Sequence, residues 1–253
     1  MARRRQQALG PKALLVARVL FAVLVLLVGV LGPTRAFASD RSYEITKVDI
    51  DATLDEDGTL HVVETRTFDF DGSFHGVYWN IPTGYNSDNG KNVEVSVTSA
   101  GESTTGSLVP FSRSGAGDDG TFAVTDQGDV TQLKIYSAHE DEKASFTISY
   151  DATGIASRWS DTRELYWKFV SDGWDVKSQN VTCTLHLPVP AGESVSAGDN
   201  VRAWGHGPLD GSVSFSGNDV VFTSPGVGTS EYAEMRVTFP ETWVAQMEQG
   251  AMG

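Results

Sequence analysis

Apolar and polar residues alternate with a period of two in one segment after another from Ser39 onward. The clearest sets lie at 93–97, 146–150, 165–169 and 233–239. Because successive side chains of an extended chain point to opposite faces, this pattern predicts strands that each bury one face. Pairs such as Asp57-Gly58 and Asn89-Gly90 between the sets are typical of tight turns. After Ser39 no stretch of about a dozen residues carries the apolar stripe of an amphipathic helix.

Short strands at turn-marked spacing predict an all-β chain with an immunoglobulin-like β-sandwich architecture. About a dozen strands are many for one small sandwich, so we favour two stacked lobes over a single large sandwich. The lobes are predicted at 39–153 and 154–240, with the boundary near Thr153-Gly154, and 241–253 is a tail. The Gly-, Ser- and Thr-rich stretch 101–120 is predicted to be a mobile excursion from the sheets.

The first 38 residues have the three-part layout of a secretory signal peptide. Three arginines at 3–5 precede a 13-residue apolar run at 19–31, which is predicted to form the signal helix. Ala36-Phe37-Ala38 then offers small residues at the positions that a signal peptidase reads, with the cut before Ser39. The rival interpretation is an uncleaved membrane anchor, but a spanning helix needs roughly 20 apolar residues. We therefore predict an exported chain, either secreted or at the extracytoplasmic face of the plasma membrane.

Charge is distributed unevenly along the chain. Residues 1–38 hold six basic residues and no acidic one, whereas the rest holds 13 basic and 33 acidic residues, a net charge of −20. Nucleic acids and anionic lipid surfaces are bound by clustered Lys and Arg. The composition therefore argues against nucleic acid as a partner, and it leaves a signal anchor as the route of membrane contact within the given residues.

No motif that performs catalysis or holds a cofactor stands in the sequence. There is no H-E-x-x-H, G-x-S-x-G, S-x-x-K, C-x-x-C or P-loop pattern, and the five histidines lack metal-ligand spacing. Cys183 is the single cysteine and alternates with Val181 and Leu185, which predicts an inert thiol on a buried strand face. We therefore expect no catalytic residue, no metal and no cofactor, with calcium at acidic turns such as 55–58 as an alternative.

Six Trp and seven Tyr are available for packing a core or for stacking against a sugar. Tyr78 and Trp79 are neighbours on a predicted strand, so they face opposite ways and one of them is expected to be exposed. Trp204 and His206 stand in a Trp-Gly-His-Gly-Pro segment with the character of a tight turn. Core packing is the simpler interpretation of most aromatics. These four residues are nevertheless predicted as candidate ligand-binding residues.

Glu64 and Arg66 break the apolar pattern of the strand predicted at 60–70, because both share the phase of its apolar residues. A buried charge must be paired and hydrogen-bonded. The structural interpretation is an ion pair of Glu64 with an arginine, namely Arg66, Arg163 or Arg236. The functional interpretation is a polar anchor for a bound ligand, so Glu64 and Arg66 join the candidate ligand-binding residues.

Groups of residues follow one another in a recognisable order along 41–240. They are Tyr43-x-Ile45, Asp57-Gly58-x-Leu60-x-Val62-x-Glu64, Phe68-x-Phe70-x-Gly72-x-Phe74-x-Gly76-Val77-Tyr78, Ile81-Pro82, Glu164-Leu165-Tyr166-Trp167, 181–188, Ala203-Trp204-Gly205-His206-Gly207-Pro208 with Gly211, and Glu234-Met235-Arg236-Val237 ending at Phe239-Pro240. In this order and spacing they resemble the bacterial membrane-protein family known as domain of unknown function 2207.

The resemblance implies a signal peptide that leads into an extracytoplasmic β-rich domain, followed by transmembrane helices. It implies no catalytic residues, because the family has no established activity. The given residues stop at Gly253, before any such helix. We therefore expect either a shortened member of the family or the ectodomain of a longer protein.

The combined prediction is an exported, non-catalytic ectodomain with a binding or interaction role at the bacterial cell surface, where a cell-envelope protein or polysaccharide is its partner. The alternatives are a carbohydrate-binding module and a cell-wall glycoside hydrolase. An aromatic strip exposed on one sheet face would favour sugar binding. A hydrolase needs two carboxyl groups roughly 5–10 Å apart in a cleft, at least one of them largely buried. A convex surface without pockets would favour protein interaction.

Overall fold

The computed structural model describes residues 41–87, 89–104 and 107–244. All regular elements in these ranges are β-strands except one 3-10 turn, η1 (Glu241–Val244). The all-β prediction is therefore confirmed. The predicted signal peptide and the end of the predicted tail lie outside the described residues. Within those ranges, no helix has the length and apolar character needed to cross a membrane.

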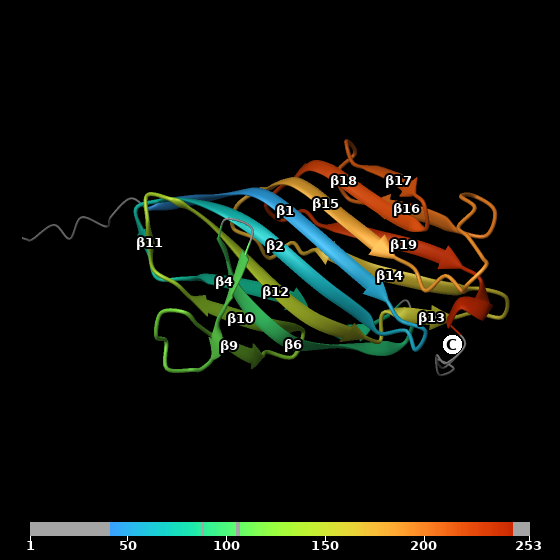
Figure 1. The fold of residues 1–253 in the computed structure, drawn as a ribbon, viewed down its shortest axis with the longest axis horizontal. Helices are drawn as coiled ribbons and strands as arrows, with labels where there is room; N and C mark the ends of the chain where they lie inside the picture. The colour runs from blue at the N-terminus through green and yellow to red at the C-terminus, as the bar shows by residue number, and fades with distance from the viewer. Residues whose placement is uncertain (1–40, 88, 105–106, 245–253) are drawn as a thin grey trace, which may run out of the picture. The chain divides into compact units, whose positions relative to one another are not determined.

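One large sheet forms the main layer of the fold. It is built from β1 (Ser42–Leu54), β2 (Leu60–Asp71), β5 (Gly84–Asn86), β6 (Lys91–Thr104), β7 (Ser107–Pro110), β12 (Lys143–Thr153), β15 (Ser178–His186), β17 (Ser212–Ser216) and β18 (Asp219–Val227). The strand order is β17-β18-β15-β1-β2-β12-β6-β5, with β7 paired to β6. Figure 1 shows β1 and β2, in blue and cyan, crossing the middle of this sheet between β15 and β12.

Two four-stranded sheets and a two-stranded ribbon complete the fold. The first sheet has the order β4-β10-β9-β8, from β4 (Val77–Pro82), β8 (Ser112–Arg113), β9 (Thr121–Asp126) and β10 (Val130–Tyr136). The second has the order β13-β14-β19-β16, from β13 (Ala156–Arg158), β14 (Arg163–Val170), β16 (Arg202–His206) and β19 (Ala233–Phe239). The ribbon pairs β3 (Ser73–Phe74) with β11 (His139–Glu140).

Both four-stranded sheets pack against the large sheet through aromatic side chains. Trp79 on β4 meets Phe68 on β2 with ring centroids 6.5 Å apart. Phe169 on β14 meets Phe222 on β18 with ring centroids 5.8 Å apart. The buried apolar residues of all these strands form one core cluster. The fold is therefore a sandwich in which a single broad layer is covered by two smaller sheets.

The large sheet is continuous across the lobe boundary predicted near Thr153-Gly154. Strands β1 and β15 pair in parallel, with Val48 opposite Val181 and Ala52 opposite Leu185. Segments from both sides of the boundary therefore share one sheet, although each side supplies its own second-layer sheet. The described strands belong to one compact unit. The division into two lobes itself stays a prediction.

The sequence indicates the irregularity of the first strand correctly, but it is less reliable for the segment 101–120. The register of β1 against β2 shifts between Ile45 and Lys47, which is where the apolar alternation slips by one residue. By contrast, strand pairing contradicts the excursion predicted at 101–120 for residues 101–104, 107–110 and 112–113, while the predicted mobility stays a prediction. Strand β6 continues into this segment and β7 folds back onto it, with Gly101 opposite Pro110. A strand at a sheet edge needs few apolar side chains, so its composition resembles that of a loop.

Candidate functional site

The outward face of the β13-β14-β19-β16 sheet gathers side chains from three segments that are far apart in sequence. The pairing register places them in three rows across β16, β19 and β14, namely Arg202, Thr238 and Glu164, then Trp204, Arg236 and Tyr166, then His206, Glu234 and Lys168. We call these nine residues the three-row face. Most of them come from the Glu-Leu-Tyr-Trp, Trp-Gly-His and Glu-Met-Arg motifs that carry the family resemblance.

Strand alternation explains why these side chains point outward. The residues between them on β14 and β19 are buried against the large sheet, namely Leu165, Trp167, Met235 and Val237. Strand β16 approaches β17 closely because Gly205 has no side chain, since a Cβ there would lie 3.3 Å from Cγ2 of Val213. Gly207 follows β16 with a φ of 138°, a backbone conformation that residues other than glycine rarely adopt.

Trp204 is supported from one side by an arginine whose position is fixed. Oε2 of Glu164 accepts a hydrogen bond of 2.7 Å from Nε of Arg236 and lies 2.6 Å from Nη2 of the same arginine, an ion pair. The guanidinium carbon of Arg236 lies 5.3 Å from the ring centre of Trp204, which is a cation–π contact. Glu164 is buried, whereas 41% of Trp204 is exposed. The indole is therefore presented to solvent against an arginine that the buried Glu164 holds in place.

Glu234 occupies the centre of the third row and is already engaged by its neighbours. Its Oε2 accepts a hydrogen bond of 2.7 Å from the hydroxyl of Tyr166, and its Oε1 lies 3.8 Å from Nζ of Lys168. The rings of Tyr166 and His206 lie 6.1 Å apart between centroids. Nζ of Lys168 also lies 4.6 Å above the ring of Tyr232. The face therefore alternates aromatic surfaces with paired charges.

Three hollows follow one another beside the three-row face. The first, of about 100 Å³, lies between this sheet and the large sheet: His206 and Glu234 line it, but most of its wall is formed by inward-facing residues such as Phe169 and Phe222. The second, of about 250 Å³, is lined by Glu234, Tyr166 and Tyr85. The third, of about 770 Å³, begins at Tyr85 and is lined further on by three exposed carboxylates, Glu94, Asp126 and Asp129. The second and third hollows share several lining residues, among them Tyr85, and are contiguous, whereas the first shares only Glu234 with the second, and Trp204 lines none of the three.

Glu64 and Arg66 form a buried ion pair, as the structural interpretation of the sequence predicted. Nε of Arg66 lies 2.6 Å from Oε1 of Glu64, and Nη1 of Arg66 donates a hydrogen bond of 2.8 Å to Oγ of Ser178. The indole N–H of Trp79 donates to Oε2 of Glu64 at 3.3 Å. The guanidinium carbon of Arg66 lies 4.0 Å from the ring centre of Trp174. Every polar edge of the pair is therefore satisfied inside the protein.

Burial determines how this pair titrates. Desolvation raises the pKa of Glu64 and lowers the pKa of Arg66, while the attraction between the two groups opposes both shifts. The neighbouring Tyr150 is also buried, and desolvation raises its pKa well above the usual value. The cavity beside these groups measures about 10 Å³, which is room for about one water molecule. A ligand larger than water does not fit at Glu64 and Arg66 in this structure.

Tyr78 and Trp79 face opposite ways, as predicted for neighbours on a strand. Trp79 is buried, whereas Tyr78 lies exposed on the outer face of the β4-β10-β9-β8 sheet. Nζ of Lys134 lies 5.1 Å from the ring centre of Tyr78 and 4.7 Å from that of Tyr136. Tyr78 is not among the residues that line the three hollows.

The six predicted ligand-binding residues thus separate into three places. Trp204 and His206 come together on the three-row face. Glu64, Arg66 and Trp79 come together in the core, and Tyr78 lies on the outer face of another sheet. Sequence reasoning missed that Tyr166, Glu234 and Arg236 complete the three-row face. Alternation could have assigned them to an outward face, but only the pairing of β14, β19 and β16 brings them to Trp204.

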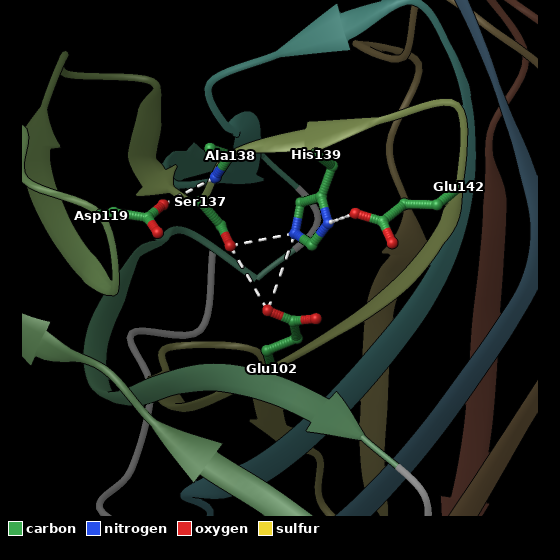
Figure 2. A network of polar contacts seen from close by, with 6 residues as sticks. All are labelled: Glu102, Asp119, Ser137, Ala138, His139 and Glu142. Carbon is green, nitrogen blue, oxygen red and sulfur yellow. Dashed lines mark hydrogen bonds and ion pairs between the residues drawn. The ribbon is translucent and has the colours of Figure 1, made fainter.

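Figure 2 shows a second polar network, where β6, β11 and the start of β12 meet. Oγ of Ser137 lies 3.0 Å from Nε2 of His139, and Nδ1 of His139 lies 2.9 Å from Oε1 of Glu142. This is the order of groups in a nucleophile, base and orienting carboxylate. Oε2 of Glu102 stands beside them, 3.3 Å from Oγ of Ser137 and 3.6 Å from Nε2 of His139.

The surroundings of Ser137 favour a structural role for this network. The backbone N–H of Ala138 donates to Oδ1 of Asp119 at 2.7 Å, so it is not free to stabilise an oxyanion. The carboxylate of Glu102 places negative charge next to the hydroxyl at which an oxyanion would develop. Ser137 is 6% exposed, and the ring of His139 stacks on Phe70 with centroids 5.6 Å apart. These contacts of His139 hold the β3–β11 ribbon against the core.

In the ranges that the structure describes, no three or more His, Cys, Asp or Glu side chains lie together in a way that could hold a metal ion. The calcium alternative at the acidic turns stays a prediction. Cys183 is fully buried, and desolvation raises the pKa of its thiol well above the usual value. This confirms that the thiol faces the core.

A family model described as "Predicted membrane protein (DUF2207) N-terminal domain" matches residues 44–239. A comparison with curated proteins found no match. Leukotriene A4 hydrolase from Saccharomyces cerevisiae is similar in structure, with a TM-score of 0.46 and 12% identity over 84% of this chain and 33% of that chain. An M1 zinc metallopeptidase from Deinococcus radiodurans is similar with a TM-score of 0.40 and 10% identity over 77% of this chain and 42% of that chain. The chain thus spans less than half the length of these two proteins.

Proposed function

The chain belongs to the DUF2207 family of predicted membrane proteins, and from this premise we propose that it is an exported, non-catalytic module that binds a polysaccharide at the extracytoplasmic face of the cell envelope. The signal-peptide pattern of residues 1–38 supports export, since a charged start, an apolar run and a small-residue site stand in the required order. The net charge of −20 after residue 38 supports a partner other than nucleic acid or an anionic lipid surface.

The observation that carries the binding role is the exposed indole of Trp204 on the three-row face. What distinguishes this ring from other exposed side chains is its support, because it is held by Arg236, which the buried Glu164 fixes in turn. Tyr166 and His206 extend the aromatic strip along the same sheet face. An aromatic strip with hydrogen-bonding neighbours matches a sugar ring, which has an apolar face and a polar rim.

The hydrolase alternative has less support. The third hollow holds the carboxylates Glu94, Asp126 and Asp129, but all three are exposed. The second hollow has Glu234 as its carboxylate, already bonded to Tyr166. In the hollows beside the three-row face, a second carboxylate that is largely buried is missing, and general acid catalysis needs such a group to keep its proton.

Co-sedimentation with insoluble cell-wall polysaccharide tests the binding role. The secreted chain is expected to sediment with the polymer, and Trp204→Ala is expected to lower the bound fraction at least tenfold. Trp159→Ala is the matched control, because 43% of Trp159 is exposed compared with 41% of Trp204, while Trp159 lies outside the three-row face. Equal loss in both variants, or no sedimentation of the unchanged chain, would contradict the proposal.

N-terminal sequencing of the mature product tests export separately. A chain that begins at Ser39 is expected, and it should be recovered from the medium or from the outer face of the membrane. A product that remains in the cytosol with Met1 intact would contradict the extracytoplasmic placement.

A further inference from the structure

We propose that the ligand of the three-row face is an uncharged polysaccharide chain that extends over several sugar units, from Trp204 past Glu234 to Tyr85. This inference rests on the proposed binding function and adds the charge class and the length of the ligand. The observations that carry it are the pairing of the charges on the face, the chemistry of its exposed groups and the continuity of the hollows.

The charges at the centre of the three-row face are already paired, and Arg202 at its end donates from Nε to a backbone carbonyl. Arg236 is bonded to Glu164 at 2.6 Å, and Lys168 lies 3.8 Å from Glu234. An anionic polymer would have to break these contacts, and it would approach a body of net charge −20, which repels it. At the face itself a cationic polymer would likewise compete with Arg236 and Lys168 for the two carboxylates, and among the described residues that line the hollows exposed carboxylates occur only beyond Tyr85, in the third hollow. A neutral ligand meets neither obstacle.

The exposed groups of the three-row face and of the hollows beside it suit hydroxyl-bearing rings. Trp204 and Tyr85 present open aromatic faces, and 71% of Tyr85 is exposed. Between them, Glu234 offers acceptor oxygens, while Lys168 and His206 carry donors at the edges of the first and second hollows. Alternation of stacking surfaces with donors and acceptors is how a binding site holds a molecule that is apolar on one side and polar at its rim.

The continuity of the hollows sets the length of the ligand. Tyr166 stands in the same row as Trp204 and also lines the second hollow, and the second and third hollows share Tyr85. A single sugar would occupy one hollow and leave the ring of Tyr85 uncovered. A chain that reaches both aromatic anchors gains the second contact without a second loss of translational freedom. We therefore expect affinity to rise with chain length until both Trp204 and Tyr85 are covered.

A length series of neutral oligosaccharides tests this inference by calorimetry on the secreted chain. The probes are disaccharides and hexasaccharides of glucose, N-acetylglucosamine, mannose and galactose. At least one hexasaccharide is expected to bind tenfold or more tightly than its disaccharide, with an affinity that does not change between low and high salt. Trp204→Ala is expected to weaken both lengths, whereas Tyr85→Ala should remove only the gain of the hexasaccharide. Tyr78→Ala is the control, because this exposed tyrosine lies outside both the three-row face and the hollows.

The outcomes separate this inference from the proposed function. Trp204-dependent binding of an oligogalacturonate or of a chitosan oligomer, without binding of any neutral hexasaccharide, would overturn the uncharged class and leave the binding role standing. Equal affinity for both lengths, or no effect of Tyr85→Ala, would overturn the extended ligand. Failure of all probes and of wall polysaccharide would overturn both proposals together.

Discussion

Two groupings of glutamate, arginine and tryptophan occur in this protein, and they differ mainly in burial. In the core, Glu64 and Arg66 lie 2.6 Å apart with side chains that are 4% and 1% exposed, and Arg66 stacks on Trp174. On the three-row face, the same distance joins Glu164 and Arg236, whose side chains are 9% and 46% exposed. The chemistry is the same, but only the second grouping has a face left over for a partner.

Burial explains why the two groupings differ in their contributions to stability and to binding. In the core, each charge loses its hydration, so the pair is required for the fold once it is present and its partners are costly to remove. At the surface, water still solvates the arginine, so the pair contributes little to stability. What the surface pair does provide is a fixed orientation of Arg236 against Trp204. Variants of the two pairs test this contrast.

Removal of the buried glutamate is expected to have the largest effect. Glu64→Ala leaves the guanidinium of Arg66 buried without its counter-ion, which should lower the free energy of unfolding by about 3–5 kcal/mol. The measurement is urea denaturation, with Glu164→Ala as the matched control at the surface pair. The contrast between the two pairs is lost if both variants have the same stability.

Replacement of the whole buried pair is expected to cost less than removal of one partner. In Glu64→Leu combined with Arg66→Met, no charge is left without a partner, so we expect stability within about 2 kcal/mol of the unchanged protein. Ser178 and Trp79 lose a hydrogen-bond partner in this variant, which is why a small loss remains. A loss as large as that of Glu64→Ala would show that the pair stabilises the fold by more than mutual compensation.

Removal of charge from the surface pair is expected to affect binding more than stability. Glu164→Gln keeps the shape of the side chain but weakens its hold on Arg236, so the free energy of unfolding should fall by about 1 kcal/mol or less. Binding to wall polysaccharide should fall several-fold because the orientation of Trp204 is no longer fixed. Denaturation and co-sedimentation of the same sample measure the two effects. A large stability loss with unchanged binding would assign Glu164 to the fold rather than to the site.

The two groupings also show how far the sequence can be interpreted without the fold. Alternation alone placed Glu64 and Arg66 on the buried face of one strand, where residues two apart are necessarily neighbours. The surface grouping is assembled from β14, β16 and β19, whose pairing depends on contacts between distant segments. The sequence therefore indicated Trp204 and His206 but could not supply Arg236 or Glu164 as their partners. The edge strand β7 was missed for a related reason, since edge positions carry little apolar signal.

Neither grouping accounts for the pH dependence that we expect near neutrality, because that comes from two histidines on the outer face of the large sheet. His61 lies 2.7 Å from Asp151 and 2.8 Å from Asp55. His186 lies 2.8 Å from Asp219 and 3.1 Å from Asp51. Hydrogen bonds to Asp151 and Asp55 raise the pKa of His61. Burial lowers the pKa of His186, but its hydrogen bonds to the two aspartates outweigh burial and raise it overall.

A folded-state pKa that is raised above the unfolded value adds stability below the unfolded pKa of about 6.5, and this stability is lost as the pH rises through the folded pKa. Stability should therefore decrease slightly from about pH 6 to about pH 8. Replacement of both His61 and His186 by Asn should flatten this slope and leave the effect of Glu64→Ala unchanged, since the sites are independent. Urea denaturation across the pH range measures both quantities. A slope that persists in the double variant would locate the titrating groups elsewhere, and a slope that disappears in Glu64→Ala would tie it to the buried pair.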